Sequence, residues 1–255
     1  MSRINVWWEG HDNSRWRLLG DRRGPVSLRR PGGLVGHPER AYHRASTGVG
    51  VTVGATTSAE MTGELELVAS ASQSDSAGDV HEAFLRSWST SRPGHLVVVD
   101  GARKLWRTPL LLDPAEPLDR SPQAGGAFAF TVPVVSLAGV WFGEVQEVSG
   151  SPVEVFNGGD LPMFPTIVWS GSGQWVTLPT GVTVQLPTVV GEYRLSTDPG
   201  TGFVVHGPNG VATGVRAAMR GLPVMGRTES MEATVWSMSA GVRLDHVERI
   251  YSPWR

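Results

Sequence analysis

The chain has 255 residues, 22 basic and 24 acidic side chains, a formal net charge of −2, and no cysteine. The missing thiols exclude disulfides, thiolate catalysis and cysteine-based metal sites. Charged residues make up only 18%, against 32 glycines and 18 prolines, a composition that favours many short strands over long helices. Neither a signal peptide nor a run of ~20 apolar residues is visible, so we expect a protein that folds in a cytosol and crosses no membrane.

The first part of the chain is predicted to be mainly β. Two apolar–aromatic runs, 3–8 and 15–19, flank a polar loop and predict an N-terminal hairpin. Further strands are predicted at 26–28, 64–70 and 128–135, with a loop at 31–38 and an extended segment at 47–53. An Asp-Gly turn at 100–101 predicts a hairpin between 95–99 and 103–108.

One helix is predicted in this part. Asp79 is placed at its N-cap, with Glu82 as capping partner, and Val80, Phe84 and Trp88 recur at helical spacing. Because a Pro-Gly pair follows at 93–94, the helix is expected to end near residue 90.

The composition changes at 149–152, Ser-Gly-Ser-Pro, which predicts a boundary between a domain of residues 1–148 and a domain of residues 149–255. Beyond it, short apolar runs separated by Gly, Pro and Asp lie at 166–169, 175–178, 182–186, 192–196, 202–206, 233–237 and 242–251. Turn signals at intervals of about 8–12 residues are typical of a β-sandwich.

The second domain is predicted to begin with a sharp turn, here called the NGGD turn, of Asn157, Gly158, Gly159 and Asp160. Both glycines tolerate positive φ, and the Asn and Asp side chains bond readily to their own backbone. Pro162 and Pro165 keep 161–165 out of a central strand, so the next strand is expected to begin at Thr166.

The charges are unevenly distributed. Residues 1–50 hold nine Arg against four acids, and residues 51–149 hold twelve acids against six bases. A basic segment of this kind is typical of a surface facing nucleic acid, of one facing an acidic neighbour, or of a solvated face.

We find no pattern for catalysis, cofactor binding or metal binding. The nearest histidine pair, His37 and His43, lacks zinc-site spacing, and no nucleophile elbow or phosphate loop occurs. Asp160 and Asp198 lie in turns, which explains both without a glycosidase role. The sequence therefore predicts a protein that is not an enzyme and needs no cofactor or metal.

Taken in order, several features resemble siphovirus distal tail proteins. They are the aromatic hairpin, Pro31-Gly32-Gly33-Leu34, the helix reaching Trp88 with Pro93-Gly94 after it, Asn157-Gly158-Gly159-Asp160, and Leu195-Ser196-Thr197-Asp198. The resemblance spans most of the chain. This sequence differs from the family pattern in two places. Ala138–Gly143 lacks the Asp-Pro pair that the family often has there, and Met225-Gly226 stands where the family has a Pro-Gly turn.

The resemblance implies a mainly β fold in two parts. Residues 1–148 would be a β-sandwich or split barrel with one α-helix, resembling a tail-tube protein, that forms a hexameric ring. Residues 149–255 would be a galectin-like β-sandwich. The ring would join the tail tube to the tail-tip or baseplate hub in the virion after assembly in the host cytoplasm. Its lumen would hold the tape-measure protein and later let DNA pass.

A lumen for DNA should avoid basic walls, because each phosphate contact would retard the DNA. We therefore predict that most arginines of residues 1–50 pair with acids of residues 51–149 in the same or a neighbouring subunit and do not line the lumen. A structure in which Arg22, Arg23, Arg29 and Arg30 all project into an open channel would contradict this prediction.

Two alternatives stay open. A galectin-like sandwich could be a carbohydrate-binding module for host attachment, with Trp169 and Trp175 as candidate sugar contacts, although either side chain could instead serve core packing. A polysaccharide hydrolase would instead depend on Asp160 or Asp198.

Overall fold

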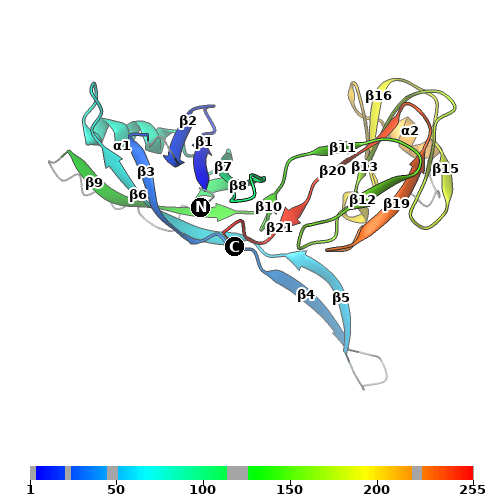
Figure 1. Cartoon of the computed structure of the whole chain (residues 1–255), viewed down its shortest axis with the longest axis horizontal. Helices are drawn as coiled ribbons and strands as arrows, with labels where there is room; N and C mark the ends of the chain where they lie inside the picture. Colours follow the sequence, from blue (N-terminus) through cyan, green and yellow to red (C-terminus); the bar gives the residue numbers. More distant parts are fainter. Residues whose placement is uncertain (1–3, 21–23, 45–50, 114–125, 220–225, 255) are drawn as a thin grey trace. The chain divides into compact units, whose positions relative to one another are not determined.

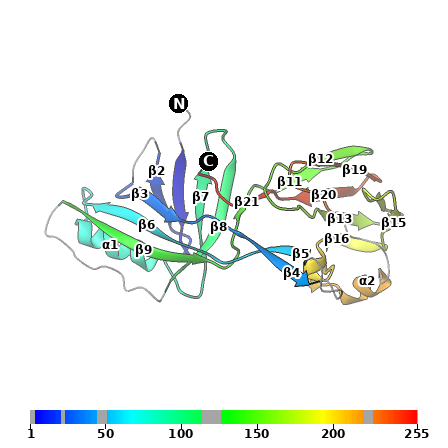
Figure 2. The ribbon, with the colours of Figure 1, turned by 90° about the horizontal axis from the view of Figure 1, so that it is seen from below.

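The computed structural model describes residues 4–20, 24–44, 51–113, 126–219 and 226–254 (Figures 1 and 2). The described chain is mainly β, as predicted, and divides into two compact units: residues 1–143 with 250–255, and residues 144–249. The chain therefore enters the second unit a few residues before the predicted boundary. The last six residues belong to the first unit and not to the second domain, because Ile250 and Trp254 pack in the first unit's apolar core.

The first unit contains ten strands and one helix within its described residues. They are β1 (Asn5–Glu9), β2 (Arg15–Leu19), β3 (Val26–Gly33), β4 (Pro38–Arg44), β5 (Val51–Ser58), β6 (Met61–Ser70), α1 (Ala77–Arg86), β7 (Gly94–Val99), β8 (Leu105–Leu112), β9 (Ala127–Ser136) and β10 (Trp141–Phe142). The two predicted hairpins, β1–β2 and β7–β8, are both present. β21 (Arg249–Ile250) returns to pair with β10.

The main sheet of the first unit curls almost into a barrel. Its order is β2-β1-β7-β8-β9-β6-β3, and neighbouring strands along this path are antiparallel. β8 makes the corner, since its first part pairs with β7 and residues 111–112 pair with β9. The two end strands approach each other where the Gly24 N–H donates to the Arg17 carbonyl over 3.3 Å. β4 and β5 form a separate hairpin that extends beyond this curled sheet (Figures 1 and 2).

Aromatic side chains dominate the core of the first unit. The Trp8 and Trp88 rings stack with centroids 3.6 Å apart, and Trp8 Nε1 donates to Ser87 Oγ over 2.9 Å. The alternating face predicted for β6, with Leu65, Leu67 and Ala69, is completely buried in the same core. Burial of such side chains is the main force that holds the unit together.

Helix α1 begins three residues earlier than predicted. Ser76 is its N-cap: Ser76 Oγ accepts from the Asp79 N–H (3.2 Å), and the Asp79 carboxylate accepts from the Ser76 N–H (3.1 Å). Asp79 is therefore the third residue of a capping box and not the cap itself. The helix ends at Arg86, before the predicted end, and Ser87 caps it.

The predicted loop at 31–38 is partly strand. β3 continues to Gly33 by pairing with β6, with a bulge between Leu28 and Arg30. Because β3 ends the sheet path, the missing N–H of Pro31 is tolerated there. Of the predicted extended segment 47–53, residues 47–50 lie outside the described residues, and residues 51–53 belong to β5.

The described residues of the second unit form short strands and two short helical segments. They are β11 (Gln146–Val148), β12 (Val153–Phe156), β13 (Thr166–Gly171), β14 (Trp175–Thr177), β15 (Thr183–Gln185), β16 (Val189–Ser196), the 3₁₀ turn η1 (Pro199–Thr201), β17 (Val205–Gly207), β18 (Gly210–Val211), α2 (Thr213–Ala218), β19 (Ala233–Met238) and β20 (Val242–His246). Because the chain leaves this unit at Arg249, the predicted strand 242–251 is split into β20 and β21.

Two sheets make up the second unit. The six-stranded sheet has the order β11-β20-β13-β16-β17-β18, and the four-stranded sheet has the order β12-β19-β14-β15. Side chains from both sheets share one core, in which Trp169, Trp236 and Leu244 are fully buried. This arrangement is the sandwich that the regular strand spacing predicts.

Candidate functional site

The NGGD turn is held by a buried side chain, that of Asn157. Asn157 Nδ2 donates to the carbonyls of Leu161 (2.8 Å) and Thr228 (3.1 Å), and its Oδ1 accepts from the Gly159 N–H (3.0 Å). The last bond is the predicted bond of the Asn side chain to its own backbone. β13 begins at Thr166, as expected.

The reason for the two glycines differs from the prediction, because neither has a positive φ. A Cβ on Gly158 would lie 2.8 Å from Glu248 Oε1, and a Cβ on Gly159 would lie 2.6 Å from the Arg249 carbonyl oxygen. The glycines are needed for space, since the Gly158 N–H donates to Glu248 Oε1 (3.0 Å) and the Asp160 N–H to the Arg249 carbonyl (2.8 Å). The NGGD turn thus clamps the segment by which the chain leaves the second unit.

The two predicted sugar contacts differ in exposure. Trp169 is only 1% exposed, its Nε1 donates to the Pro187 carbonyl (3.0 Å), and its ring packs beside Tyr193. A buried ring offers no face on which a sugar could stack, so Trp169 serves the core. Trp175 is half-buried on β14, and its role in sugar binding stays a prediction.

Asp198, one of the two aspartates considered for a hydrolase, has a local structural role. Its Oδ1 accepts from the Gly200 N–H over 2.8 Å, which caps the turn η1. This is the turn role predicted for it.

Polar side chains gather on the outward face of the six-stranded sheet, here called the polar face. Its members are Glu147, Thr166, Glu192, Arg194, Ser196, His206, Arg243 and Asp245. Strand register brings them together: Asp245 and Ser196 both lie opposite Thr166, and Arg194 lies opposite His206. Residues two apart on a strand share a face, so five neighbouring strands, β11, β20, β13, β16 and β17, contribute to this surface.

Ion pairs organise the polar face around Arg243. Its guanidinium contacts Glu192 (2.9 Å), Asp245 (2.9 Å) and Glu147 (3.6 Å), and its pKa is raised chiefly by the hydrogen bond to Glu192. Hydrogen bonds from Arg243 and then from Arg194 hold the pKa of the Glu192 carboxyl below its usual value. Several charges share the one Arg243 guanidinium, and such a network is the arrangement in which partly exposed ion pairs contribute to stability.

A hollow of about 300 Å³ opens in the polar face. Its lining is Val145, Thr166, Arg194, Ser196, His206, Asp245 and Val247. Asp245 is only 7% exposed, and its Oδ2 has no hydrogen-bond donor among the described residues, although Arg194 Nη1 lies 3.3 Å away. The hollow is therefore bordered by a guanidinium, a buried carboxylate, two hydroxyls and an imidazole, but most of its exposed lining is apolar.

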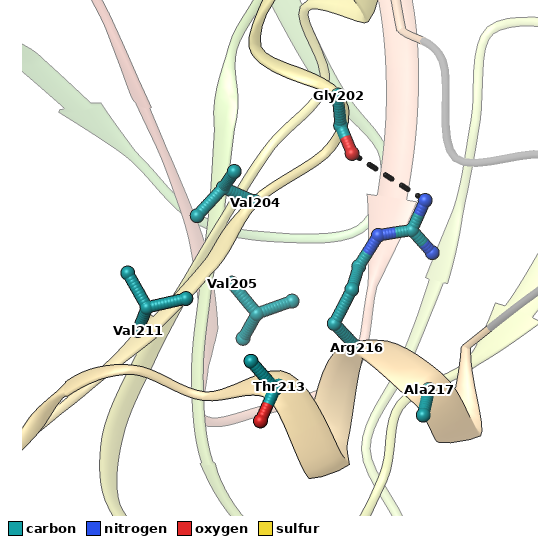
Figure 3. A pocket seen from close by; sticks show the side chains of 7 residues that line it. All are labelled: Gly202, Val204, Val205, Val211, Thr213, Arg216 and Ala217. Atoms are coloured by element: carbon teal, nitrogen blue, oxygen red, sulfur yellow. Dashed lines mark hydrogen bonds between the residues drawn. The ribbon is translucent and has the colours of Figure 1, made fainter.

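A second hollow, of about 410 Å³, lies between β17, β18 and α2 and is mostly apolar. Figure 3 shows Val204, Val205 and Val211 around it, with Arg216 reaching toward the Gly202 carbonyl, to which it donates over 3.4 Å. Since Arg216 is the one charged side chain in its lining, acid–base partners do not converge here.

The first unit has a basic and aromatic hollow of about 540 Å³ on the outward side of β1, β2 and β7. The Arg15 guanidinium lies 4.6 Å from the centroid of the Trp7 ring, Trp7 Nε1 donates to Glu9, and Arg17 lies opposite Trp7 on the neighbouring strand. Its lining is Asn5, Trp7, Arg15, Arg17, Leu19 and Val99. This set is typical of protein–protein contact surfaces, in which Trp and Arg contribute most of the energy.

Among the described residues of one chain, no arginine of residues 1–50 forms an ion pair with an acid of residues 51–149. Arg15 contacts Glu9, in its own segment, and Arg29 and Arg30 are exposed on β3 without an ion pair among the described residues. Arg22 and Arg23 lie outside the described residues. Pairing with a neighbouring subunit stays a prediction.

Within the described residues, no three or more His, Asp or Glu side chains are placed to hold a metal ion. His37 is exposed, and the His43 side chain is not among those described. None of the helices found in the described part of the chain has the length and apolar character needed to span a bilayer.

Comparison with models of known protein families and with curated protein sequences found no match. The fold, however, is similar to that of the SPP1 Dit (gp 19.1) protein, described as a paradigm of the hub adsorption apparatus in phages that infect Gram-positive bacteria. The TM-score is 0.59 at 12% identity, over 96% of this chain and 98% of that chain. The chain has the fold of the Dit protein.

Chains of the phage P2 baseplate in its activated conformation are also similar. The structure with Ca gives a TM-score of 0.50 at 12% identity, over 97% of this chain and 98% of that chain. The structure with Sr gives 0.50 at 10% identity, over 96% and 97%. The resemblance to distal tail proteins inferred from ordered short motifs is thus matched by the fold of the whole chain, including its second unit.

The sequence did not reveal the polar face. A signal was present, since Arg194 and Ser196, and likewise Arg243 and Asp245, alternate with apolar residues at the spacing of a strand with one wet face. That spacing shows which side chains point outward, but not which strands are neighbours.

Proposed function

We propose that this protein is a distal tail protein, a structural component of the tail tip of a long-tailed phage. The observation that carries the proposal is the similarity to the Dit fold along nearly the whole length of both chains. Folds host varied functions, so the proposal also draws on the order of sequence motifs that led to the same group of proteins.

The proposed role is architectural. Six copies of the first unit would close into a ring that joins the tail tube to the tail-tip or baseplate hub in the virion, assembled in the host cytoplasm. The ring would contact the major tail tube protein and the hub protein, and would surround the tape-measure protein and later the passing DNA. The second unit would be a galectin-like sandwich outside the ring.

A closed ring needs two different, complementary surfaces on each copy. The hollow around Trp7, Arg15 and Arg17 is one candidate surface, since it exposes Arg and Trp on regular strands. The excess of acids in residues 51–149 supplies opposite charge for the other surface. Complementary charge would set the orientation in which copies meet.

The test is the mass and shape of the purified full chain. We expect light scattering to give about six times the 27.4 kDa of one chain, and electron microscopy to show closed rings. The variant Arg15→Glu with Arg17→Glu should lower the mass. The charge-matched control, Arg216→Glu with Arg227→Glu in the second unit, should not. A persistent monomer, both alone and when co-expressed with the tail-tube protein of the same phage, would refute the ring.

A further inference from the structure

The sequence contains two Asn-Gly pairs, Asn157-Gly158 and Asn209-Gly210, and the structure holds them differently. In this dipeptide the backbone nitrogen of the glycine can reach the side-chain carbonyl carbon of the asparagine, because glycine carries no Cβ that hinders the approach. Asparagine is accordingly one of the thermolabile residues of proteins. Whether a given pair reacts depends on how firmly the fold holds its two reacting groups.

The pair Asn157-Gly158 is held at both reacting groups. Nδ2 of Asn157, which would leave as ammonia, donates to the carbonyls of Leu161 and Thr228. The nitrogen that would attack, that of Gly158, donates its hydrogen to Glu248 Oε1 over 3.0 Å. Asn157 is also fully buried, so the ring could close only after the NGGD turn had opened.

The pair Asn209-Gly210 lacks these restraints. Asn209 lies in the turn between β17 and β18, is exposed, and has no side-chain hydrogen bond among the described residues. Space around Gly210 is open, since a Cβ built there would meet no atom within 4 Å. β18 is the last strand of its sheet and pairs with β17 through two residue pairs, so opening it disrupts little.

We propose that Asn209 is a site of spontaneous deamidation in the folded chain and that the fold protects Asn157 from the same reaction. The Gly210 nitrogen loses its proton and bonds to Cγ of Asn209, and the Cγ–Nδ2 bond breaks with release of ammonia. One water molecule then opens the resulting cyclic imide at either of its two carbonyls, which leaves aspartate or isoaspartate at position 209. The net reaction consumes water, releases ammonia, and needs neither an enzyme nor a redox partner.

The isoaspartate product changes the hairpin in two ways. It adds a negative charge, and it inserts one carbon of the former side chain into the main chain between residues 209 and 210. The register of a hairpin depends on the length of its turn, here in the pairs His206 with Val211 and Gly207 with Gly210. We therefore expect β18 to separate from β17 and to remove one wall of the hollow shown in Figure 3.

Ageing of the full chain at ~37 °C and about pH 8.5, followed by peptide mass mapping, tests the proposal. The peptide that contains Asn209 should gain about 1 Da, as NH₂ is replaced by OH, and fragmentation should identify isoaspartate in it. The peptide that contains Asn157 should react at least about tenfold more slowly, because its turn must open first. In concentrated guanidinium chloride the two rates should agree within about threefold, because neither pair is then held by the fold.

Asn209→Gln is the matched control, since its longer side chain closes the corresponding ring far more slowly. Hydrogen exchange at 205–211 should become faster in the aged parent but not in aged Asn209→Gln. Fresh Asn209→Asp should keep the slow exchange, because it adds the charge without the extra backbone carbon.

Three results would overturn the proposal. They are no mass gain at Asn209 in the folded chain when the unfolded chain reacts, equal rates at Asn157 and Asn209 in the folded chain, or the same change in exchange in aged Asn209→Gln. Both asparagines belong to the second unit, and the readouts are the masses and exchange of its peptides, so failure of the proposed ring leaves these results unaffected.

Discussion

Replacing Asn157 with alanine should specifically destabilise the second unit. Asn157 is fully buried, and its amide is the one described partner of the Leu161 carbonyl and of the Gly159 N–H. The Thr228 carbonyl keeps a second donor, the Met163 N–H, at 2.9 Å. Two buried polar groups are therefore left unpaired in the variant.

The size of the effect follows from those two groups. Each buried group without a partner costs about 1–3 kcal/mol, and water entering the space of the lost side chain would recover part of that. We expect the free energy of unfolding of the second unit to fall by about 2–4 kcal/mol. With a denaturant slope of ~1–3 kcal/mol per molar urea, the unfolding midpoint should fall by about 1–2 M.

Hydrogen exchange with mass spectrometry across a urea series is the appropriate assay, because the two units need not unfold together. Peptides from 144–249 should lose protection at lower urea in Asn157→Ala, whereas peptides from the first unit should not change. Asn209→Ala, at an exposed turn between β17 and β18, is the control and should stay within ~0.5 kcal/mol of the parent. A change below that limit in Asn157→Ala, or an equal loss in both units, would show that the buried amide does not hold the turn.

Three further changes probe the second unit. Gly159→Ala should cost about 1–3 kcal/mol, because its Cβ would meet the Arg249 backbone, whereas Gly214→Ala in α2, with open space around it, should be neutral or gain up to ~1 kcal/mol. Burial lowers the pKa of His246 in the folded chain. As pH drops below about 6.5, the ordinary pKa of histidine, this side chain therefore takes up a proton in the unfolded chain before it does so in the folded chain. The stability of the second unit should fall over this range until the pH reaches the folded pKa. Arg243→Met should cost about 1–3 kcal/mol by removing charge while keeping the apolar stem.

Each change has its own readout and counter-result. Equal urea midpoints for Gly159→Ala and Gly214→Ala would contradict the crowding argument. His246→Asn should flatten the decline in stability between pH 7.5 and 5.5, and a variant with the parent's slope would assign that proton uptake to another group. The loss in Arg243→Met should shrink at high salt, since part of the network is exposed; a loss unaffected by salt would point to packing instead.

Local chemistry was a good guide to turns and to strand identity. The Asn157 side chain bonds to the Gly159 N–H as its sequence context predicts, and β13 begins where the prolines allow it. The helix start was misplaced because both Ser76 and Asp79 are good caps. The two hydrogen bonds that Ser76 and Asp79 exchange between side chain and backbone N–H show that Ser76 is the N-cap and Asp79 the third residue of the helix.

What the sequence could not show depends on contacts between distant residues. The crowding at Gly158 comes from Glu248, ninety positions further on. The hollow in the polar face exists because β20, β13 and β16 are neighbours in one register, which places Asp245 and Ser196 on either side of Thr166. Alternation within a strand identifies outward residues, but the strand order is decided by the packing of the whole unit.

The chain leaves the first unit after Gly143 and returns to it at Ile250, so the second unit is an insertion within the first. β10 ends one residue before the chain departs, and β21, with which it returns, pairs with β10, so the entry and exit points are adjacent. An insertion with adjacent ends behaves as a cassette: it can be cut out and the gap closed by a short linker, or exchanged for another domain, without reordering the host strands. By the same topology, a tag fused after residue 255 is attached to the first unit. Removing residues 250–255 would take Ile250 and Trp254 out of the core of the first unit.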